Sequence, residues 1–286
     1  METTENRAIE KEPKRPYRLG VALSGGGARG LAHAGALMAI EEAGLKPDVI
    51  AGVSAGSVVA VLYAAGRKPI EIASIFSERG FRDFAELKLG SGGLFGIKRF
   101  EKFILSNLDG AKNIEDLKIP TYIGVTDFDN GCPAVFHDGA IGPRMIASCS
   151  IPIVFAPVRI DGVQYVDGGV LRNMPAWIIR DKCDYLIGIN VSPLRNYNTT
   201  SIAGAALRAY NLMAKANQAQ DMAMCDIAIE TTEISNYKVF DLSQIQKVFV
   251  SGYLSTRRAL RQAGLWNPDN TKDTGRISDL RPLMDE

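Results

Sequence analysis

Histidine and cysteine are scarce in this chain, and its cysteines are not grouped. The 286 residues include two histidines and four cysteines. The cysteines are Cys132, Cys149, Cys183 and Cys225. None belongs to a CxxC pair or has a histidine beside it, so the pattern predicts neither a zinc site nor a disulfide framework. We expect reduced thiols, most of them buried.

The chain also lacks a long apolar run. A membrane-spanning helix needs about eighteen consecutive apolar residues, and no such stretch occurs. The first residues, METTENRAIEKEPKRPYR, are polar and lack the apolar core of a secretory signal. We therefore predict no transmembrane segment and a cytoplasmic protein.

Neither sign of charge is in excess. Lys and Arg together number 33 and Asp and Glu 32, which leaves a formal net charge of +1. A chain so close to neutrality has no long-range field to attract a polyanion. Nucleic acid is therefore not predicted as a partner.

The composition is that of one globular domain with polar ends. Hydrophobic residues make up 46% of the chain and charged residues 23%, enough apolar material for a large core. Residues 1–17 mix charges with prolines and show no apolar period, so we expect a flexible leader there. We place the folded domain at 18–263 and a polar C-terminal tail at 264–286.

Strands and helices are predicted to alternate. A short β-type run from Arg18 leads through a glycine turn to apolar residues at helical spacing over 31–43, and Gly44 follows as a helix stop. The same order recurs with a buried strand at 48–53 and a helix at 57–65. Such alternation is typical of an α/β fold with a mainly parallel central sheet.

The rest of the chain extends this pattern. Further strands are expected at 121–127, 163–168 and 185–191, and further helices at 141–148, 175–182, 202–221 and 242–263. Leu, Phe and Gly residues mingle over 79–98. For that segment we favour a surface loop over a lipid-facing lid.

Gly52-Val53-Ser54-Ala55-Gly56 forms a GxSxG motif between an expected strand and an expected helix. A nucleophilic serine on such a sharp turn needs small neighbours, because larger ones would clash. The context makes Ser54 a candidate nucleophile and Gly52 and Gly56 the glycines of its turn.

Ser24-Gly25-Gly26-Gly27-Ala28-Arg29-Gly30 lies between the first expected strand and its helix. Glycines there let backbone N–H groups point at an anion. The tetrahedral intermediate of acyl transfer carries such an anion, so Gly25, Gly26 and Gly27 suit an oxyanion hole. Arg29 would brace the loop or meet a phosphate.

The same loop also spells GxGxxG through Gly25, Gly27 and Gly30, the fingerprint of dinucleotide-binding folds. Such a fold places an acidic residue at the end of its second strand to hold the ribose. Here the Ser54 turn occupies that position. The oxyanion interpretation is favoured, and dinucleotide binding stays as an alternative.

Tyr165-Val166-Asp167-Gly168-Gly169 ends another expected strand with a carboxylate and two glycines. By itself Asp-Gly is an ordinary turn dipeptide. Beside the other two motifs, Asp167 becomes the candidate base. Gly168 and Gly169 let the chain turn sharply behind it.

A Ser-His-Asp triad requires an imidazole, and the chain offers only His33 and His137. His33 lies in a helix, where packing or local capping explains it. A triad of Ser54, Asp127 or Asp129, and His137 remains open. No histidine follows Asp167, so with Asp167 as the acid the simplest machinery is a Ser-Asp dyad, in which the carboxylate takes the serine proton directly.

The three motifs in this order, SGGGARG, GVSAG and DGG, resemble those of the bacterial patatin-like phospholipases. The stretch ASCSIPIVFAPVRIDGVQYVDGGVLRNMP is similar to the segment leading to that family's catalytic aspartate. The resemblance covers residues 18–191 and extends weakly to 263.

The resemblance implies a three-layer α/β/α sandwich and a Ser-Asp dyad made of Ser54 and Asp167. It also implies an oxyanion hole at Gly25, Gly26 and Gly27 with Arg29 alongside, and neither cofactor nor metal. The implied substrates are phospholipids, lysophospholipids, neutral lipids and small esters. The expected partners are thus a lipid or acyl ester and, transiently, a membrane surface. A non-enzymatic lipid-binding or regulatory protein on the same fold is a further alternative.

Overall fold

The computed structural model describes residues 14–77, 80–84, 86–87, 93–194, 201–239 and 241–266. The first strand, β1, begins at Tyr17 and the last helix, α10 (Ile245–Gln262), ends at Gln262. Residues 1–13 of the predicted leader and 267–286 of the predicted tail lie outside the described residues.

An eight-stranded sheet runs through the described part of the chain, in the order β11-β10-β1-β2-β5-β9-β8, with β6 paired to β5. Its strands are β1 (Tyr17–Leu23), β2 (Val49–Val53), β5 (Thr121–Asp127), β6 (Cys132–Phe136), β8 (Val158–Ile160), β9 (Val163–Asp167), β10 (Cys183–Asn190) and β11 (Ile227–Glu230). From β11 to β5 all neighbours are parallel, which confirms the predicted α/β class.

The strands beyond β5 reverse direction. Both β6 and β9 run antiparallel to β5, and β8 runs antiparallel to β9. The strand predicted at 163–168 therefore exists as β9 but does not continue the parallel series. Alternating apolar residues indicate a strand without stating its direction.

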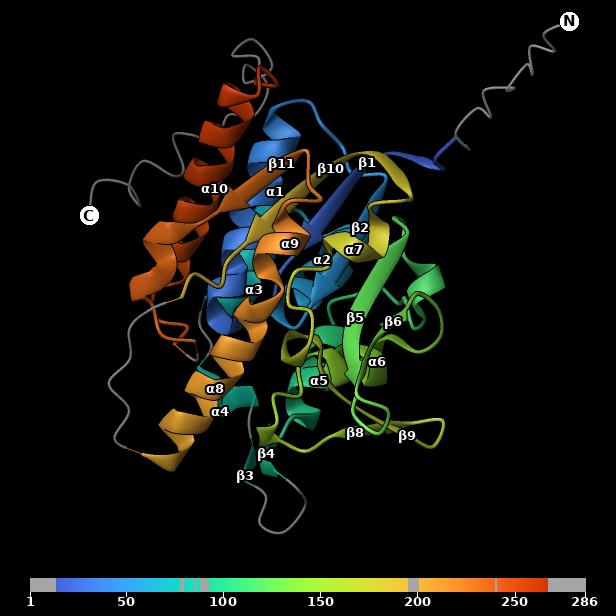
Figure 1. Cartoon of the computed structure of the whole chain (residues 1–286), viewed down its shortest axis with the longest axis vertical. Helices are drawn as coiled ribbons and strands as arrows, with labels where there is room; N and C mark the ends of the chain where they lie inside the picture. The colour runs from blue at the N-terminus through green and yellow to red at the C-terminus, as the bar shows by residue number, and fades with distance from the viewer. Residues whose placement is uncertain are drawn as a thin grey trace, which may run out of the picture.

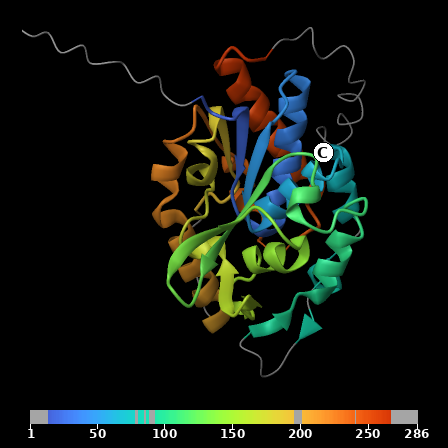
Figure 2. The same cartoon turned by 90° about the vertical axis from the view of Figure 1, so that its right-hand side faces the viewer.

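Helices cover both faces of the sheet (Figures 1 and 2). Along β1, Val21 and Leu23 point into one core together with α1 (Ala32–Glu42), α2 (Ala55–Ala64), α3 (Pro69–Phe76) and α10. Ala22 points into a second core with α7 (Ala176–Ile179), and Met222 of α9 (Gln218–Met222) packs against it. Because strand side chains alternate, one strand serves both layers.

Helices α1 and α10 touch backbone to backbone. A Cβ on Gly35 of α1 would overlap the carbonyl oxygen of Phe249, and one on Gly252 of α10 would overlap that of Ala32. The two glycines thus let the helices lie closer than ordinary side chains permit.

Two predicted segments differ in the structure. The helix expected over 202–221 is divided at Asn217 into α8 (Ile202–Ala216) and α9. Within 79–98, the described residues form α4 (Phe81–Phe84), β3 (Glu86–Leu87) and β4 (Gly93–Gly96), and β4 pairs with β7 (Ile153–Phe155). The surface loop expected here is thus replaced in part by regular structure, and Phe84 of α4 is buried against the core.

Candidate active site

Ser54 occupies a strained turn between β2 and α2. Its φ of 52° and ψ of −127° lie outside the ordinary regions for a residue with a side chain. The side chain is buried, with 5% of Ser54 exposed. A non-glycine residue held in such a conformation is typical of functional sites.

The glycines on either side of Ser54 explain how the turn closes. A Cβ on Gly52 would come within 2.5 Å of Gly56, and one on Gly56 would overlap the carbonyl oxygen of Leu23 in β1. The predicted need for small residues at both positions therefore has a steric cause.

A serine that the sequence did not single out supports this turn. The Ser54 N–H donates to Ser148 Oγ at 2.8 Å, and that hydroxyl donates to the Gly124 carbonyl of β5 at 2.7 Å. Ser148 ends α6 (Ile141–Ser148) and is fully buried. No short motif marks it, because its partners are 94 and 24 residues away.

Asp167 comes to the same level of the sheet as Ser54, from the other side of β5. Val53 of β2 pairs with Gly124, and Asp167 of β9 pairs with Val125. The carboxylate is fully buried. Its Oδ1 accepts hydrogen bonds from the Gly169 N–H at 2.8 Å and from the Tyr210 hydroxyl at 2.9 Å.

The second carboxylate oxygen, Oδ2, is buried and makes no hydrogen bond of standard geometry with the described residues. Burial is the main cause that raises the pKa of Asp167 to about 6; the Ser54 hydroxyl, the Gly169 N–H and the Tyr210 hydroxyl each lower it. Such a pKa suits a base that works near neutral pH.

The glycine-rich loop reaches the serine. A Cβ on Gly25 would lie 3.0 Å from the Ser54 Cβ, so the two backbones approach closely. The Gly25 N–H donates to the Asn173 carbonyl at 3.3 Å. Gly26 and Gly27 stand at the start of the 3-10 helix η1 (Gly27–Leu31), where the first N–H groups have no partner within the helix.

Of the three predicted oxyanion-hole glycines, only Gly27 lines the pocket beside Ser54. Gly27 has a φ of +61°, and a Cβ there would overlap the Val239 carbonyl. Arg29 is buried, and its Nε donates to the Gly26 carbonyl at 3.4 Å. In this structure Arg29 therefore braces the loop.

Each histidine has a partner other than Ser54 and Asp167. His33 Nε2 is 2.7 Å from the Ser24 carbonyl, and burial lowers the pKa of this histidine to about 4, so the neutral ring donates to the loop. His137 is exposed beside the ring of Tyr122.

The acids of the alternative triad have other partners. Asp127 accepts hydrogen bonds from the backbone and side chain of Asn130, and Asp129 accepts two from Gln164. The structure therefore does not bring His137 and either of these acids to Ser54 in the way a triad requires.

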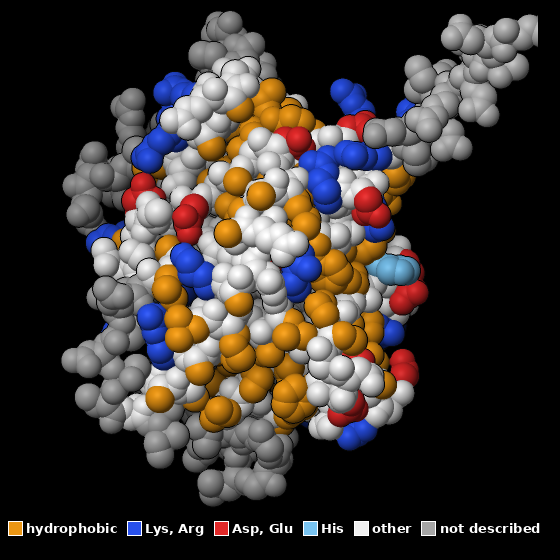
Figure 3. Space-filling model, viewed as in Figure 1, with side chains coloured by type: hydrophobic (Ala, Val, Ile, Leu, Met, Phe, Trp, Pro, Cys, Tyr) orange, Lys and Arg blue, Asp and Glu red, His pale blue; other side chains and the backbone are white. Residues whose placement is uncertain are grey.

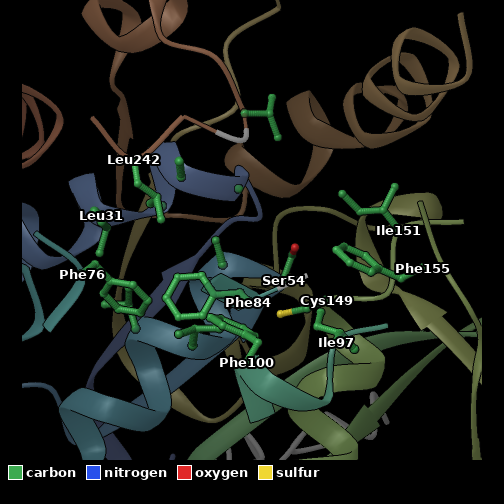
Figure 4. Close-up of a pocket in the computed structure, with 17 residues that line it drawn as sticks. Leu31, Ser54, Phe76, Phe84, Ile97, Phe100, Cys149, Ile151, Phe155 and Leu242 are labelled. Atoms are coloured by element: carbon green, nitrogen blue, oxygen red, sulfur yellow. The ribbon is translucent and has the colours of Figure 1, made fainter. Parts of the chain in front are cut away.

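An apolar pocket of about 140 Å³ opens beside Ser54. Figure 4 shows the Ser54 oxygen directed toward it, with phenylalanine rings on both sides. None of its described lining residues is charged: Gly27, Ala28, Gly30, Leu31, Ser54, Ala55, Val58, Val59, Phe76, Phe84, Ile97, Phe100, Cys149, Ile151, Phe155, Val239 and Leu242. Phe84 and Ile97 come from the segment for which we expected a surface loop.

Cys149 also lines this pocket, next to Ser54 (Figure 4). Burial raises the pKa of its thiol well above the ordinary value, and the Ser54 and Ser57 hydroxyls only partly oppose this. A thiol with a raised pKa is a poor nucleophile. Of the two groups, the serine is the better candidate for covalent chemistry.

Neither a metal-binding cluster nor a membrane-spanning helix occurs among the described residues. Within the described ranges, no three His, Cys, Asp or Glu side chains are grouped so that they could hold a metal ion. No helix in the described part of the chain has the length and apolar composition that spanning a bilayer requires.

Fold and site together define a class: an α/β protein with a buried serine on a strand-to-helix turn, a glycine-rich loop and an apolar pocket. A family model described as patatin-like phospholipase matches residues 21–179, more than half of the chain. The chain belongs to the patatin-like phospholipase family, as its motifs predict.

Curated relatives are longer than this chain. Neuropathy target esterase of Drosophila melanogaster is 31% identical over 182 residues, which cover 60% of this chain and 13% of that protein. An uncharacterized NTE family protein of Mycobacterium tuberculosis is 38% identical over 160 residues, covering 55% and 44%. The chain thus spans less than half the length of these relatives.

Among solved structures, VipD from Legionella pneumophila is similar with a TM-score of 0.47 and 14% identity. The match covers 88% of this chain and 68% of that one.

Proposed function

We propose that the protein is a serine acyl-ester hydrolase that acts on phospholipids, lysophospholipids or other lipid acyl esters through a Ser54–Asp167 dyad. The observation that carries this proposal is the position of Ser54, on a strained turn at the wall of an apolar pocket, with a buried carboxylate beside it. This arrangement couples a nucleophile, a base and room for an acyl chain.

In the first half of the reaction, Asp167 Oδ2 takes the hydroxyl proton while Ser54 Oγ bonds to the ester carbonyl carbon. The carbonyl electrons move to oxygen and form an oxyanion. The carbon–oxygen bond to the alcohol then breaks, and the departing alkoxide takes the proton from Asp167. An acyl-enzyme and a free alcohol result.

In the second half, water attacks the acyl-enzyme and gives its proton to Asp167. The new tetrahedral intermediate collapses by breaking the bond to Ser54 Oγ, which recovers the proton as the fatty acid leaves. Both intermediates carry an oxyanion. Of the three glycines expected to bind it, Gly25 already donates its N–H to the Asn173 carbonyl, so the N–H groups of Gly26 and Gly27 are the proposed donors. Preorganised donors of this kind each lower the barrier by about 3–4 kcal/mol.

A carboxylate is a weak base for an alcohol, because its pKa lies far below that of a hydroxyl. Two features of the site reduce this difference in pKa. Burial raises the pKa of Asp167 to about 6 and so makes it a stronger base. Ser54 also precedes the first turn of α2, where the helix dipole favours negative charge on the serine oxygen.

The pocket suits an acyl chain better than a polar substrate. Its described lining residues carry no charge and include three phenylalanines on one side, Phe76, Phe84 and Phe100. An apolar chain loses contact with water there at no electrostatic cost. The polar part of the substrate would stay outside, toward solvent.

Contact with a lipid surface is part of the proposal. Ile153 of β7 is 55% exposed, and Leu212 and Met213 of α8 are 48% and 40% exposed. Apolar side chains gather on the lower half of one face of the molecule (Figure 3). Ile151 and Phe155, on either side of Ile153 in sequence, line the pocket. Exposed apolar groups beside a pocket would let a lipid pass from bilayer to enzyme.

The first test is labelling of the protein with a fluorophosphonate, followed by intact mass and peptide mapping. We expect one adduct on Ser54, none on that peptide in Ser54→Ala, and labelling at least 100-fold slower in Asp167→Asn, the order expected for loss of a general base. His137→Ala is the control and should label like the wild type.

Each other result has a definite meaning. A folded wild type that forms no adduct and hydrolyses no ester would favour the lipid-binding or regulatory protein. Slow labelling in His137→Ala would favour the triad. A melting temperature raised by millimolar NAD(P) would favour the dinucleotide-binding alternative.

Lipid-surface contact is tested by sedimentation with phosphatidylcholine vesicles. Ile153 has a φ of +74°, a conformation that asparagine tolerates better than isoleucine. Ile153→Asn should therefore fold, bind fewer vesicles and hydrolyse a soluble short-chain ester at the wild-type rate. Equal vesicle binding by the two proteins would exclude this surface.

A further inference from the structure

Tyr210 reaches the proposed base from an element that the motifs do not include. It lies on α8, 43 residues after Asp167 and beyond the 21–179 family match. Its ring is buried with Ile151 and Phe155, and its hydroxyl donates to Asp167 Oδ1 at 2.9 Å. A packed ring with one polar tip fixes the position of that tip.

The hydrogen bonds of Asp167 are unequally shared between its two oxygens. Oδ1 accepts from both Gly169 N–H and Tyr210 hydroxyl, while Oδ2 has no hydrogen bond of standard geometry. Two donors on one oxygen fix the plane of the carboxylate and leave the other oxygen for the serine proton.

We propose that Tyr210 is a positioning residue of the dyad, which holds Asp167 through Oδ1 so that Oδ2 is the atom that accepts the proton of Ser54. This inference rests on the proposed hydrolase function. It assigns a role to α8, where no motif of the sequence predicts one.

Tyr210 keeps its proton throughout the working range of the enzyme. Burial, followed by the negative charge of Asp167, raises the pKa of the tyrosine well above its ordinary value, and Arg29 only partly opposes this. The donors to Asp167 are the Ser54 hydroxyl, the Gly169 N–H and the Tyr210 hydroxyl, all neutral near neutral pH, while the neutral Cys149 thiol and the charged Arg29 act at longer range on this cluster. A neutral donor stabilises the ionised carboxylate.

The second glycine of the DGG motif makes room for this contact. A Cβ on Gly169 would overlap the Tyr210 hydroxyl. The same glycine supplies the other donor to Oδ1. Its small size and its N–H therefore both serve the orientation of Asp167.

Other contacts hold α8 and α9 near the DGG turn without Tyr210. Asn217 Nδ2 donates to the Leu171 carbonyl at 3.0 Å, and Arg172 pairs with the buried Asp221 through two hydrogen bonds. Tyr210→Phe keeps the packed ring and removes only the hydroxyl. We therefore expect this variant to fold with α8 in place.

The test compares Tyr210→Phe with the wild type over about pH 4.5 to 9, by fluorophosphonate labelling rate and by kcat/KM for a short-chain ester. Loss of a donor to the ionised form should move the acid limb upward by about one pH unit. The rate near pH 6 should fall severalfold through kcat, with KM unchanged, and recover only in part at about pH 9, where the carboxylate is ionised but has lost one of the two donors that orient it.

Tyr253→Phe is the matched control. The Tyr253 hydroxyl donates to the buried Glu42 at 2.7 Å, between α10 and α1, outside the pocket lining. This variant loses the same kind of bond and should keep the wild-type acid limb. A general loss of stability would affect both variants alike.

The outcomes separate the two proposals. A labelled wild type together with a Tyr210→Phe variant that keeps both the wild-type acid limb and the wild-type rate overturns the role of Tyr210 and leaves the dyad intact. A folded wild type that forms no adduct overturns the proposed function, and the inference falls with it.

Discussion

The burial of Asp167, the proposed base, lowers the stability of the folded protein when its carboxyl is ionised. Its carboxyl is fully buried, and burial is the main cause of its pKa of about 6, above the ordinary value of 3.8. Above that pH the folded protein must hold a buried negative charge, and the hydrogen bonds from the Gly169 N–H and the Tyr210 hydroxyl only partly offset the loss of water. The unfolded chain carries the same charge in water, so ionisation favours unfolding.

This predicts a pH-dependent stability difference between wild type and Asp167→Asn. The folded state binds the proton more tightly than the unfolded chain, so the stabilisation from protonation is full below about pH 4 and is lost as pH rises through 6. Asp167→Asn avoids that loss and should be more stable above pH 6, by on the order of 3 kcal/mol.

Urea unfolding of both proteins at about pH 4 and pH 8 measures this difference. If the difference in the free energy of unfolding between Asp167→Asn and the wild type is the same at the two pH values, Asp167 ionises with an ordinary pKa. Because only one group differs, other buried acids such as Asp221 affect both proteins equally.

At the scale of elements, α3, α4 and α5 (Lys98–Leu105) together form one wall of the pocket. The rings of Phe76 and Phe84 meet edge to face at 6.1 Å, and those of Phe84 and Phe100 at 5.3 Å. In Figure 4 the Phe84 ring lies between Ser54 and Phe76. Phe76 therefore lies beyond Phe84 as seen from Ser54, and we propose that the end of a bound acyl chain meets its ring.

The position of Phe76 predicts that it limits acyl-chain length. Phe76→Leu should raise kcat/KM for longer p-nitrophenyl esters severalfold relative to shorter ones, because one methylene in an apolar pocket changes transition-state binding by about 1–3 kcal/mol. Phe103→Leu is the control. Phe103 packs on Phe76 at 5.5 Å but is not among the described residues lining the pocket.

A shift of the chain-length profile in both variants would mean that general loosening of the ring cluster is responsible. No shift in either would place the end of the acyl chain elsewhere. Both results would leave the assignment of Ser54 untouched, since hydrolysis itself continues.

At the scale of the whole molecule, α10 joins the C-terminal part of the chain to the part that carries the motifs. It follows the family-matched residues 21–179 in sequence, yet it packs against α1, which follows the glycine-rich loop. Gly35 and Gly252 allow this contact. The layer that covers one face of the sheet is therefore completed by a helix from outside the match.

Gly252→Ala should lower the free energy of unfolding by about 1–3 kcal/mol, because overpacking against the Ala32 carbonyl exceeds the gain in helix propensity. Ser251→Ala, on the same helix, raises propensity without that overlap and is the control. Urea unfolding of the two variants gives the comparison. A stabilised Gly252→Ala would show that the helices separate easily.

By itself, the sequence was sufficient for the local features. GVSAG, SGGGARG and DGG each lie where a strand gives way to a turn, and the structure has β2, β1 and β9 ending at those motifs. Apolar periodicity located these strands because the pattern of a strand, and the glycines of the turn that ends it, all lie within a few consecutive residues. The roles of Ser54 and Asp167 in catalysis remain predictions from those motifs.

Only the tertiary structure decided which distant groups meet at the site. Ser148 supports Ser54, and Tyr210 contacts Asp167, across more than 40 positions of the sequence. The antiparallel direction of β9 depends on the order of the strands in the sheet. Strand alternation and helix spacing are short-range patterns, so they carry no information about direction or distant partners. Packing of the layers brings these groups together.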